Sequence, residues 1–505
     1  MEYQCPSFPI FVSFIIFIFI LFKTLKKSKI STRNLPPGPW KLPLIGNMHQ
    51  LAGALPHRRL GTLASKYGPI MRLQLGEITS IVISSPKYAK QVMKTHDITF
   101  AQRPHLLATT VATYNYTDIA FAPYGDYWRQ MRKICTLELL TAKRVQSFRS
   151  IREEEVSKLM RSLSSNAGSA INFSNMINAV TYSIISRAAC SKIWKGGDVF
   201  IPTMKKFIVA AGGFSLFDVY PSVPALHWFD GTKSRLEKAQ KLIDKLFQNI
   251  IDEHRTERAA RKSGGKDEED LVDVLLNFQE HGNLEIPLTD DNIKAVILDV
   301  FSGGSETSST TVEWIMSELL KDPRVMEKAQ QEVRKVFRKE GNVDESRIHE
   351  LNYLKLVIKE TLRLHPPLPL VLPRECRESC VINDYDIPVN SKIIVNAWAI
   401  GRDPNYWKEA EKFYPERFQD SPIDIKGTDY EFLPFGAGRR ICPGILFGMS
   451  NVEFPFAQLL YHFDWKLPDG VKPETFDMAE DFGVVVKRKN DLYSIATPYI
   501  PQLAE

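Results

Sequence analysis

A cysteine near the C-terminus, Cys442, lies in the segment FGAGRRICPG. A thiolate that binds a metal needs a defined direction and hydrogen-bond donors to its sulfur. Gly438 and Gly444 permit a tight turn that can aim backbone N–H groups at this sulfur. Phe435 can shield the sulfur from water, and Arg440 can bind an anion beside it. The alternative for a lone cysteine is a buried free thiol. The segment matches the spacing Phe-x-x-Gly-x-Arg-x-Cys-x-Gly at all five fixed positions, which makes it a specific signature.

A second chemical signal is the run Gly303-Gly304-Ser305-Glu306-Thr307, which lies within a long stretch of helical apolar spacing. Each glycine inside a helix costs about 1 kcal/mol relative to alanine, so the pair needs a reason. One reason is close packing against another helix. The other is a flat cofactor that lies against the backbone and needs room for a diatomic ligand. A bond from the Thr307 hydroxyl to the Gly303 carbonyl would loosen that turn, and Glu306 with Thr307 could then relay protons.

Three further charged residues occur at a spacing that suits a structural role. Glu360 and Arg363 lie three residues apart on a predicted helix, so they share one face. The pattern Glu-x-x-Arg carries little weight alone, because charged helices contain it by chance. Here Arg417, in the sequence Pro-Glu-Arg-Phe, lies between this helix and the cysteine segment.

The elements that must position these residues are mainly helical. Apolar spacing predicts helices over residues 147–162, 234–257, 291–320, 323–338 and 351–365. Short alternating runs predict strands at Ile70–Leu75, Ser80–Ile83 and Lys392–Val395. The expected fold class is therefore mainly α with a small β region, in one large domain.

The N-terminal residues carry a membrane signal. Residues 8–22 read FPIFVSFIIFIFILF, which reaches the short end of a membrane span. A cleaved signal peptide is the alternative, but there is no small-x-small cleavage site and the basic residues follow the apolar run. Lysines after the span favour a cytosolic location for the rest of the chain. We expect residues 1–33 to be a membrane anchor, residues 34–40 a proline-rich hinge and residues 41–505 the catalytic domain.

Composition narrows the function classes. The 505 residues are 44% hydrophobic and 25% charged, as in a globular chain. The six cysteines are too few and too scattered for a disulfide scaffold. Much of the net charge of +6 lies in residues 1–33, so the composition gives no sign of the basic face that a nucleic-acid binder needs.

With the spacing around Cys442, the sequence resembles the cytochrome P450 family. It is similar to plant microsomal (A-type) members of the large clan that includes many terpenoid oxidases, and the resemblance extends from the anchor to Lys489. The resemblance implies the cytochrome P450 fold after a single N-terminal transmembrane helix. It also implies heme b (iron protoporphyrin IX) as cofactor, with Cys442 as the proximal thiolate that favours O–O cleavage.

The same resemblance assigns roles to the other motifs. Glu306 and Thr307 match the family's oxygen-activating acid–threonine pair, with Gly303 where alanine is common. The family's Glu-Arg-Arg triad, which holds the cysteine pocket together, is matched by Glu360, Arg363 and Arg417. Heme also brings two propionates, which need charge-assisted donors. The candidates for these donors are Trp128, Arg132, Arg374 and Arg440.

The resemblance implies a monooxygenase that uses O2 and NADPH-derived electrons. Its substrate contacts are expected near Leu106–Tyr124, Phe207–Phe217, Lys238–Leu246, Val300–Thr307, Pro366–Leu372 and Phe482–Val486. This lining is largely apolar, which favours a diterpenoid or sesquiterpenoid over phenolic or alkaloid substrates. A P450 that rearranges hydroperoxides without a reductase is a further alternative, but such members lack the acid–threonine pair.

The expected electron donor is NADPH-cytochrome P450 reductase, on the cytosolic side of the endoplasmic reticulum membrane. Reductases of this type present an acidic surface, so the receiving face should be basic. Arg129 and Lys133 are each offset by one residue from the proposed propionate donors Trp128 and Arg132, so they should point outward. Arg439 is a further candidate for this face. The alternative is that these are ordinary solvated surface charges.

Overall fold

The computed structural model describes residues 34–53, 55–193, 203, 216–223, 231–260 and 269–500. The anchor predicted over residues 1–33 lies outside this part of the chain. Among the helices that are described, none is both long enough and apolar enough to cross a membrane.

Helices make up most of the described chain. The α-helices are α2 (Met48–Leu51), α3 (Pro56–Tyr67), α4 (Pro86–Lys90), α5 (Leu107–Ala112), α6 (Asp126–Ile134), α7 (Ala142–Ser147), α8 (Arg149–Ser165), α9 (Phe173–Cys190), α11 (Leu216–Val219), α12 (Thr232–Ala260), α13 (Leu271–His281), α14 (Asp290–Lys321), α15 (Pro323–Val336), α16 (Asn352–Leu364), α17 (Ala397–Ile400) and α18 (Ile445–His462). The turns of 3-10 or π type are η1 (Gln91–Thr95), η2 (Cys135–Leu139), η4 (Glu345–Glu350), η5 (Pro415–Phe418), η6 (Gly438–Arg440) and η7 (Pro473–Thr475).

The strands are short and form small sheets. They are β1 (Ile70–Leu75), β2 (Ile78–Ile83), β3 (Ala170–Asn172), β4 (Arg374–Glu375), β5 (Cys380–Ile382), β6 (Tyr385–Ile387), β7 (Lys392–Val395), β8 (Phe463–Lys466), β9 (Glu480–Asp481), β10 (Lys487–Arg488) and β11 (Tyr493–Pro498). The largest sheet has the order β1-β2-β7-β4, in which β2 and β7 are parallel and the other pairs antiparallel. A three-stranded sheet has the order β3-β11-β8, and β9-β10 and β5-β6 form pairs.

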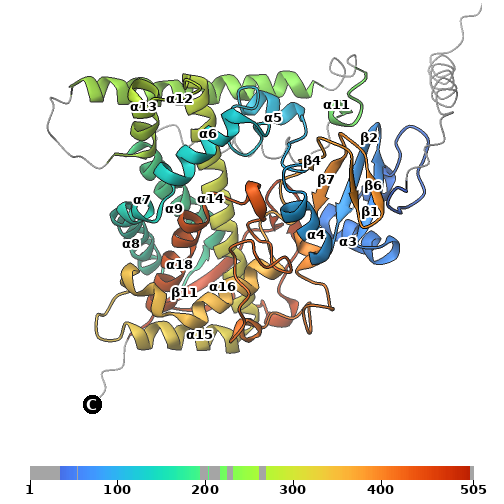
Figure 1. Cartoon of the computed structure of the whole chain (residues 1–505). Coiled ribbons are helices and arrows are strands. Elements are labelled where there is room, and N and C mark those ends of the chain that lie inside the picture. Colours follow the sequence, from blue (N-terminus) through green and yellow to red (C-terminus); the bar gives the residue numbers. More distant parts are fainter. Residues whose placement is uncertain are drawn as a thin grey trace, which may run out of the picture.

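The molecule divides into a helical part and a part that contains the four-stranded sheet (Figure 1). Helix α14 runs through the middle of the helical part, with α12 lying across its end. Val312, Ile315, Met316 and Leu319 recur at helical spacing on α14 and are fully buried in the main core cluster. This core is shared with α9 and α18, so the central helix is fixed on more than one side.

The predicted helices and strands are confirmed with small differences at their ends. The helix expected over 291–320 is α14, Asp290–Lys321. It begins one residue earlier because Thr289 and Asn292 form a capping box, in which each side chain accepts from the other's backbone N–H. The strand expected at Ser80–Ile83 begins at Ile78, because its pairing with β1 continues to the turn.

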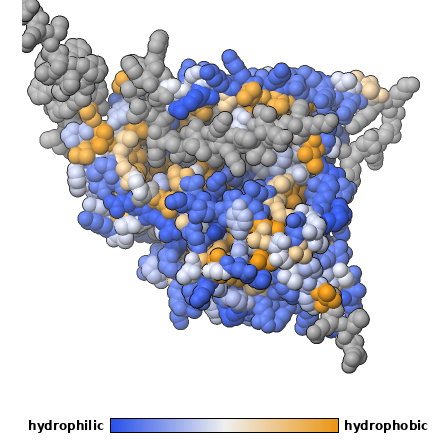
Figure 2. All heavy atoms as spheres, turned by 180° about the vertical axis from the view of Figure 1, so that it is seen from behind, coloured by the Kyte–Doolittle hydropathy of each residue, from blue (hydrophilic) through white to orange (hydrophobic). Residues whose placement is uncertain are grey.

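The proline-rich segment 34–40 contains no helix or strand and is attached to the body. Asn34 bonds with its backbone N–H to Asp386 and with its side chain to the carbonyl of Asp384, both at 2.8 Å. The Pro37 carbonyl accepts from the N–H of Arg72 on β1 at 2.7 Å. Figure 2 shows a mainly hydrophilic surface, with hydrophobic atoms at the left, on the side of the four-stranded sheet, and in smaller groups elsewhere on this face.

Candidate functional site

The cysteine loop, residues 435–444, contains η6 and ends where α18 begins. Cys442 lies between these two elements. The backbone N–H of Cys442 donates to the carbonyl of Phe435 at 3.1 Å, which closes the loop. The N–H of Gly444 donates to the Cys442 sulfur. Burial raises the pKa of the Cys442 thiol, whereas the Gly444 N–H and the positive charge of Arg132 act to lower it. The loop therefore directs a donor at the sulfur and α6 adds a cation, as a thiolate ligand requires.

The glycines of this loop are required for different structural reasons. Gly438 has φ +70°, and a Cβ there would lie 2.1 Å from the carbonyl oxygen of Met93. Gly436, which the sequence analysis did not single out, also has φ +70°. Gly444 was expected to permit the tight turn, but its φ is −95° and a Cβ there would lie at an ordinary 4.0 Å from the Cys442 sulfur. The turn therefore depends on Gly436 and Gly438.

Two of the predicted propionate donors are bound to backbone carbonyls. Arg440 donates to Ala101 at 2.8 Å, to Ala122 at 2.6 Å and to Ile119 at 3.3 Å, and its guanidinium carbon lies 4.3 Å from the centre of the Trp128 ring. Trp128 also donates to the Ile119 carbonyl, at 3.0 Å. These two side chains share one carbonyl cradle, formed largely by the loop before α6.

The other two predicted donors are placed differently. Arg374, on β4, donates to the Ala437 carbonyl at 2.7 Å and pairs with Asp97 at 3.1 Å. Arg132, on α6, is half-buried and faces the charge of Cys442. Within the described residues, no hydrogen bond or ion pair involves the guanidinium of Arg132. Its donors are therefore available to an anionic group beside the cysteine.

Two residues of this site were missed by the sequence analysis. Arg103 is buried and donates to the carbonyls of Ala120, Leu372 and Pro373. Asp97 accepts from the Arg439 backbone N–H at 2.9 Å and thereby holds the cysteine loop. Arg103 and Asp97 come from a segment that carries no recognisable motif.

The charge balance of the site fits an anionic cofactor. Burial, together with neighbouring arginines, lowers the pKa of Arg103 well below its usual range and that of Arg440 to about 9. Arg132 and Arg374 also have pKa values lowered by burial. A surplus of buried guanidinium groups is costly unless anions compensate it. The two propionates of heme would supply that compensation, so these residues fit the cofactor.

The sequence left two explanations for the glycine pair of α14, close helix packing and open space beside a cofactor, and each glycine fits a different one. A Cβ at Gly304 would lie 2.7 Å from Cδ1 of Ile185 on α9, so this glycine permits close helix packing. A Cβ at Gly303 would meet nothing within 4 Å. Residues 292–298 and 308–320 are buried, whereas 302–307 between them keep accessible surface. Gly303 therefore faces open space in the middle of an otherwise buried helix.

The expected side-chain bond is present in the same turn. The Thr307 hydroxyl donates to the Gly303 carbonyl at 2.6 Å. Ser302 and Ser305 bond in the same manner to the carbonyls of Leu298 and Phe301. Hydroxyls that bond back to the helix compete with its own hydrogen bonds, so this turn is weaker than its neighbours. Both Glu306 and Thr307 keep accessible surface.

The structure brings the three residues of the predicted triad into contact. Glu360 accepts from Arg363 at 2.7 Å and from Arg417 at 2.9 Å. Glu360 and Arg363 are completely buried. Arg363 also donates to the carbonyls of Gly401 and Ala410, which lie in the segment that leads to the cysteine loop. The triad thus joins α16 to that segment.

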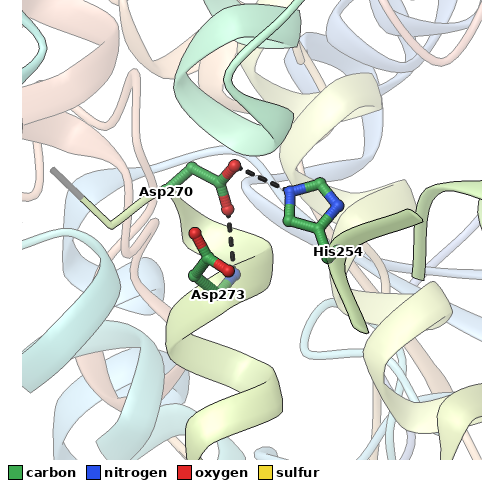
Figure 3. A group of neighbouring side chains, drawn as sticks. All are labelled: His254, Asp270 and Asp273. Atoms are coloured by element: carbon green, nitrogen blue, oxygen red, sulfur yellow. Dashed lines mark hydrogen bonds and ion pairs between the residues drawn. The ribbon is translucent and has the colours of Figure 1, made fainter. Parts of the chain in front are cut away.

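A histidine–carboxylate group lies away from this site (Figure 3). His254 donates from Nδ1 to the Ile250 carbonyl at 2.7 Å and from Nε2 to Asp270 at 2.8 Å. Asp270 also accepts from Ser191 and caps α13 at the Asp273 N–H. Burial is the largest effect and acts to lower the pKa of His254, but the hydrogen bonds to Asp270 and Ile250 and the charges of Asp270 and Asp273 together outweigh it, so the pKa is raised. Both ring nitrogens are donors, so the group is an ion pair joining α12 to α13.

The predicted substrate segments are only partly described. Residues 207–215 lie outside the described residues. In Pro366–Leu372, Val371 has φ +51°, which is strained for a β-branched residue. The Val371 side chain lies beside Gly436 of the cysteine loop, where a Cβ would be 3.4 Å away. This segment therefore borders the metal-ligand loop.

Comparisons with known proteins agree with this geometry. The chain matches the family model "Cytochrome P450" over residues 36–495. It is 55% identical over 509 residues to cytochrome P450 71D445 of Euphorbia lathyris, covering 99% of each chain. It is 52% identical over 477 residues to premnaspirodiene oxygenase of Hyoscyamus muticus, covering 94% of this chain and 95% of the other.

A solved structure shows the same architecture. A zebra fish cytochrome P450 with abiraterone has a TM-score of 0.74 and 25% identity, covering 88% of this chain and 99% of that chain. The family match extends over the cysteine loop, the Gly303–Thr307 turn and the Glu360 triad. The chain therefore belongs to the cytochrome P450 family of heme-thiolate monooxygenases.

Proposed function

We propose that this P450 hydroxylates an apolar plant metabolite, a sesquiterpenoid or diterpenoid, with O2 and electrons from NADPH. The observation that carries the proposal is the 52% identity, over 94% of the chain, to premnaspirodiene oxygenase. The segment beside the cysteine loop, Pro366–Leu372, reads PPLPLVL and has no polar side chain. Such a lining binds apolar substrates in preference to polar ones.

A turnover screen tests the substrate class. The full-length protein and a plant reductase are supplied with NADPH and a panel of sesquiterpenes, diterpenes, phenols and alkaloids. NADPH consumption and oxygenated products should appear with terpenes. Products from phenols or alkaloids alone would overturn the terpenoid assignment. Turnover of a hydroperoxide without the reductase would show that the enzyme does not need electrons from NADPH.

The residues of the site have distinct proposed roles. Heme b, when bound through Cys442, supplies dioxygen activation. Arg132, Arg374, Arg440 and Trp128 hold the propionate side, and Phe435 shields the sulfur. Replacing Cys442 with serine should abolish the thiolate-type absorption of the reduced carbon monoxide complex, because oxygen donates less electron density than sulfur. Retention of that band would remove Cys442 from this role.

We also propose a single-pass anchor in the endoplasmic reticulum membrane, with the catalytic domain in the cytosol. The apolar run at 8–22 and the lysines after it support this placement. Deleting residues 1–22 should move the protein from the membrane fraction towards solution with heme incorporation preserved. Continued tight membrane association would show that other apolar surface binds the bilayer.

A further inference from the structure

A carboxyl group on α14 binds the loop that forms the carbonyl cradle. Asp299 lies one turn before Gly303, and its Oδ2 accepts from the backbone N–H of Ile119 at 2.7 Å and of Ala120 at 3.3 Å. The carbonyl of the same Ile119 accepts from Trp128. Asp299 therefore connects the oxygen-activating helix to the propionate side of the site through a single peptide segment.

A second carboxyl group belongs to that loop. Asp118 is fully buried, and its Oδ2 accepts from the Phe121 N–H at 2.9 Å. Its other oxygen, Oδ1, is buried and accepts no hydrogen bond from the described residues. The side chain of Asp299 lies within hydrogen-bonding reach of Asp118. Asp118 is buried and Asp299 is only partly accessible, so two such close carboxylates cannot both be ionised without a large cost, and one proton is expected between them.

The surrounding charges decide which carboxyl holds the proton. Asp118 faces the guanidinium groups of Arg103 and Arg440, which favour its anion. Burial nevertheless raises the pKa of Asp118 to about 6. Asp299 has no cation of that kind, and burial followed by the charge of Asp118 raises its pKa well above the usual range.

The remaining groups near the pair do not supply a compensating charge. Tyr127 and Cys135 both have raised pKa values, chiefly through burial, and both are neutral near pH 7. Arg132 lies near Cys135, on the side of the cysteine ligand. The proton is therefore placed on Asp299, where its O–H can satisfy the Asp118 oxygen.

We propose that Asp299 and Asp118 are a positioning pair that shares one proton and fixes the loop of residues 118–122 for heme binding. In this arrangement Asp299 fixes the Ile119 peptide, whose carbonyl holds Trp128 and Arg440, and Asp118 fixes the turn that ends at Phe121. In this role the two carboxyls act through the loop and are not ligands of the cofactor. The proposal rests on the heme site described above and extends it to α14.

The pair makes heme retention depend on pH. The proton is bound more tightly in the folded protein than in the unfolded chain, so its stabilising effect is present at low pH and is lost as the pH rises through the folded pKa. The second negative charge then repels Asp118 and loosens the loop. Release of heme should accelerate by up to about tenfold per pH unit as the pH rises towards the folded pKa, and should level off above it.

The experiment measures heme transfer from the full-length holoprotein to excess apomyoglobin between about pH 6 and about pH 9. Asp299→Asn keeps an oxygen for the Ile119 N–H and supplies an N–H for Asp118, without a titrating proton. It should hold heme with a nearly flat pH profile, whereas the wild type releases heme faster as the pH rises. Asp299→Ala, which removes the acceptor, should release heme faster at every pH.

Asp291→Asn is the matched control, because it removes a largely exposed carboxylate from the same helix. It should follow the wild-type profile. If Asp299→Asn does not accumulate as holoprotein, Asp118→Asn replaces it, because an amide at either position removes the shared proton. A wild-type profile without pH dependence, or the same dependence in the asparagine variants, would overturn the proposal. Failure of every variant and the wild type to bind heme would instead refute the heme site itself.

Discussion

At the scale of single residues, two adjacent glycines of α14 have different structural roles. Gly303 and Gly304 are adjacent, yet one faces open space and the other accommodates Ile185 of α9. The reason is the helical geometry, which turns successive residues by about 100°. The Thr307 hydroxyl donates to the Gly303 carbonyl, so Thr307 belongs to the same helical turn as the open space beside Gly303.

The two glycines can be separated by alanine substitution. Gly304→Ala should destabilise the fold by about 1–3 kcal/mol, because its Cβ would overlap Ile185. Gly303→Ala should keep or raise stability, since alanine is the better helix former by about 1 kcal/mol, but its methyl group would occupy space beside the proposed oxygen site and lower turnover. Thermal unfolding and product formation measure both effects. Equal changes in the two variants would contradict this division of roles.

Thr307 is predicted to control proton delivery. Thr307→Ala should raise peroxide release and lower product per NADPH, while heme content stays unchanged. Thr311→Ala is a matched control, because Thr311 makes the same type of bond, to the Thr307 carbonyl at 2.8 Å, but is buried one turn further along. The ratio of product to NADPH tests this role. An unchanged ratio in Thr307→Ala would refute the hypothesis that Glu306 and Thr307 relay protons.

At the scale of elements, buried ion pairs fix the helices relative to the loops. Glu360 on α16 binds Arg363 on the same helix and Arg417 from η5. Arg363 reaches onward to the carbonyls of the 401–412 segment. This connection lies far from the accessible turn of α14 in the sequence, and its proposed role is structural.

Neutralising Glu360 should therefore weaken the fold before it alters the chemistry. Glu360→Gln leaves two arginines without their carboxylate, and removing one partner of a buried pair costs about 3–5 kcal/mol. We expect a lower denaturation midpoint and poor heme incorporation. Glu350→Gln is the control, because Glu350 pairs with Arg347 at the same spacing on the surface and should have little effect. Similar losses in both variants would refute the structural role.

At the scale of the whole molecule, the exposed cations Arg129, Lys133 and Arg439 remain the predicted binding surface for the electron donor. Arg129 and Lys133 on α6 are exposed, whereas Trp128 is buried and Arg132 half-buried. Arg439 is also half-exposed, with its backbone held by Asp97. Arg439 belongs to the cysteine loop, and Arg129 and Lys133 lie on the same helix as Arg132, whose charge acts on Cys442. Arg129 pairs with Asp126, whose side chain is even more exposed, so Arg129 stays on the surface.

Reversing the charge of this surface tests reductase binding. Arg129→Glu together with Lys133→Glu should slow reductase-driven turnover and weaken its salt dependence. Peroxide-driven turnover, which needs no partner, should survive. Arg338→Glu with Lys339→Glu, an exposed pair just after α15, is the control and should leave both activities unchanged. Equal loss of both activities in the α6 variant would indicate a damaged heme site instead.

The sequence by itself determined the features that depend on local spacing. Apolar periodicity predicted α8, α12, α14, α15 and α16, because a buried helical face must recur with the helical turn. The order of residues around Cys442 predicted a metal-ligand loop, because its chemistry is contained in ten consecutive residues. The hydrogen bond from Thr307 to the Gly303 carbonyl could also be predicted from the sequence, because both residues lie within one helical turn.

Only the tertiary structure decided how distant residues complete the site. Arg103 and Asp97 bind segments hundreds of residues away, and their own neighbourhood has no periodic or motif signal. Asp118 and Asp299 are 181 positions apart in the numbering, and each alone is an ordinary aspartate. Burial changes their chemistry by removing water from charged groups, and burial follows from the packing of α14 against the loop. Charge neutralisation and proton sharing therefore appear only when the chain is folded.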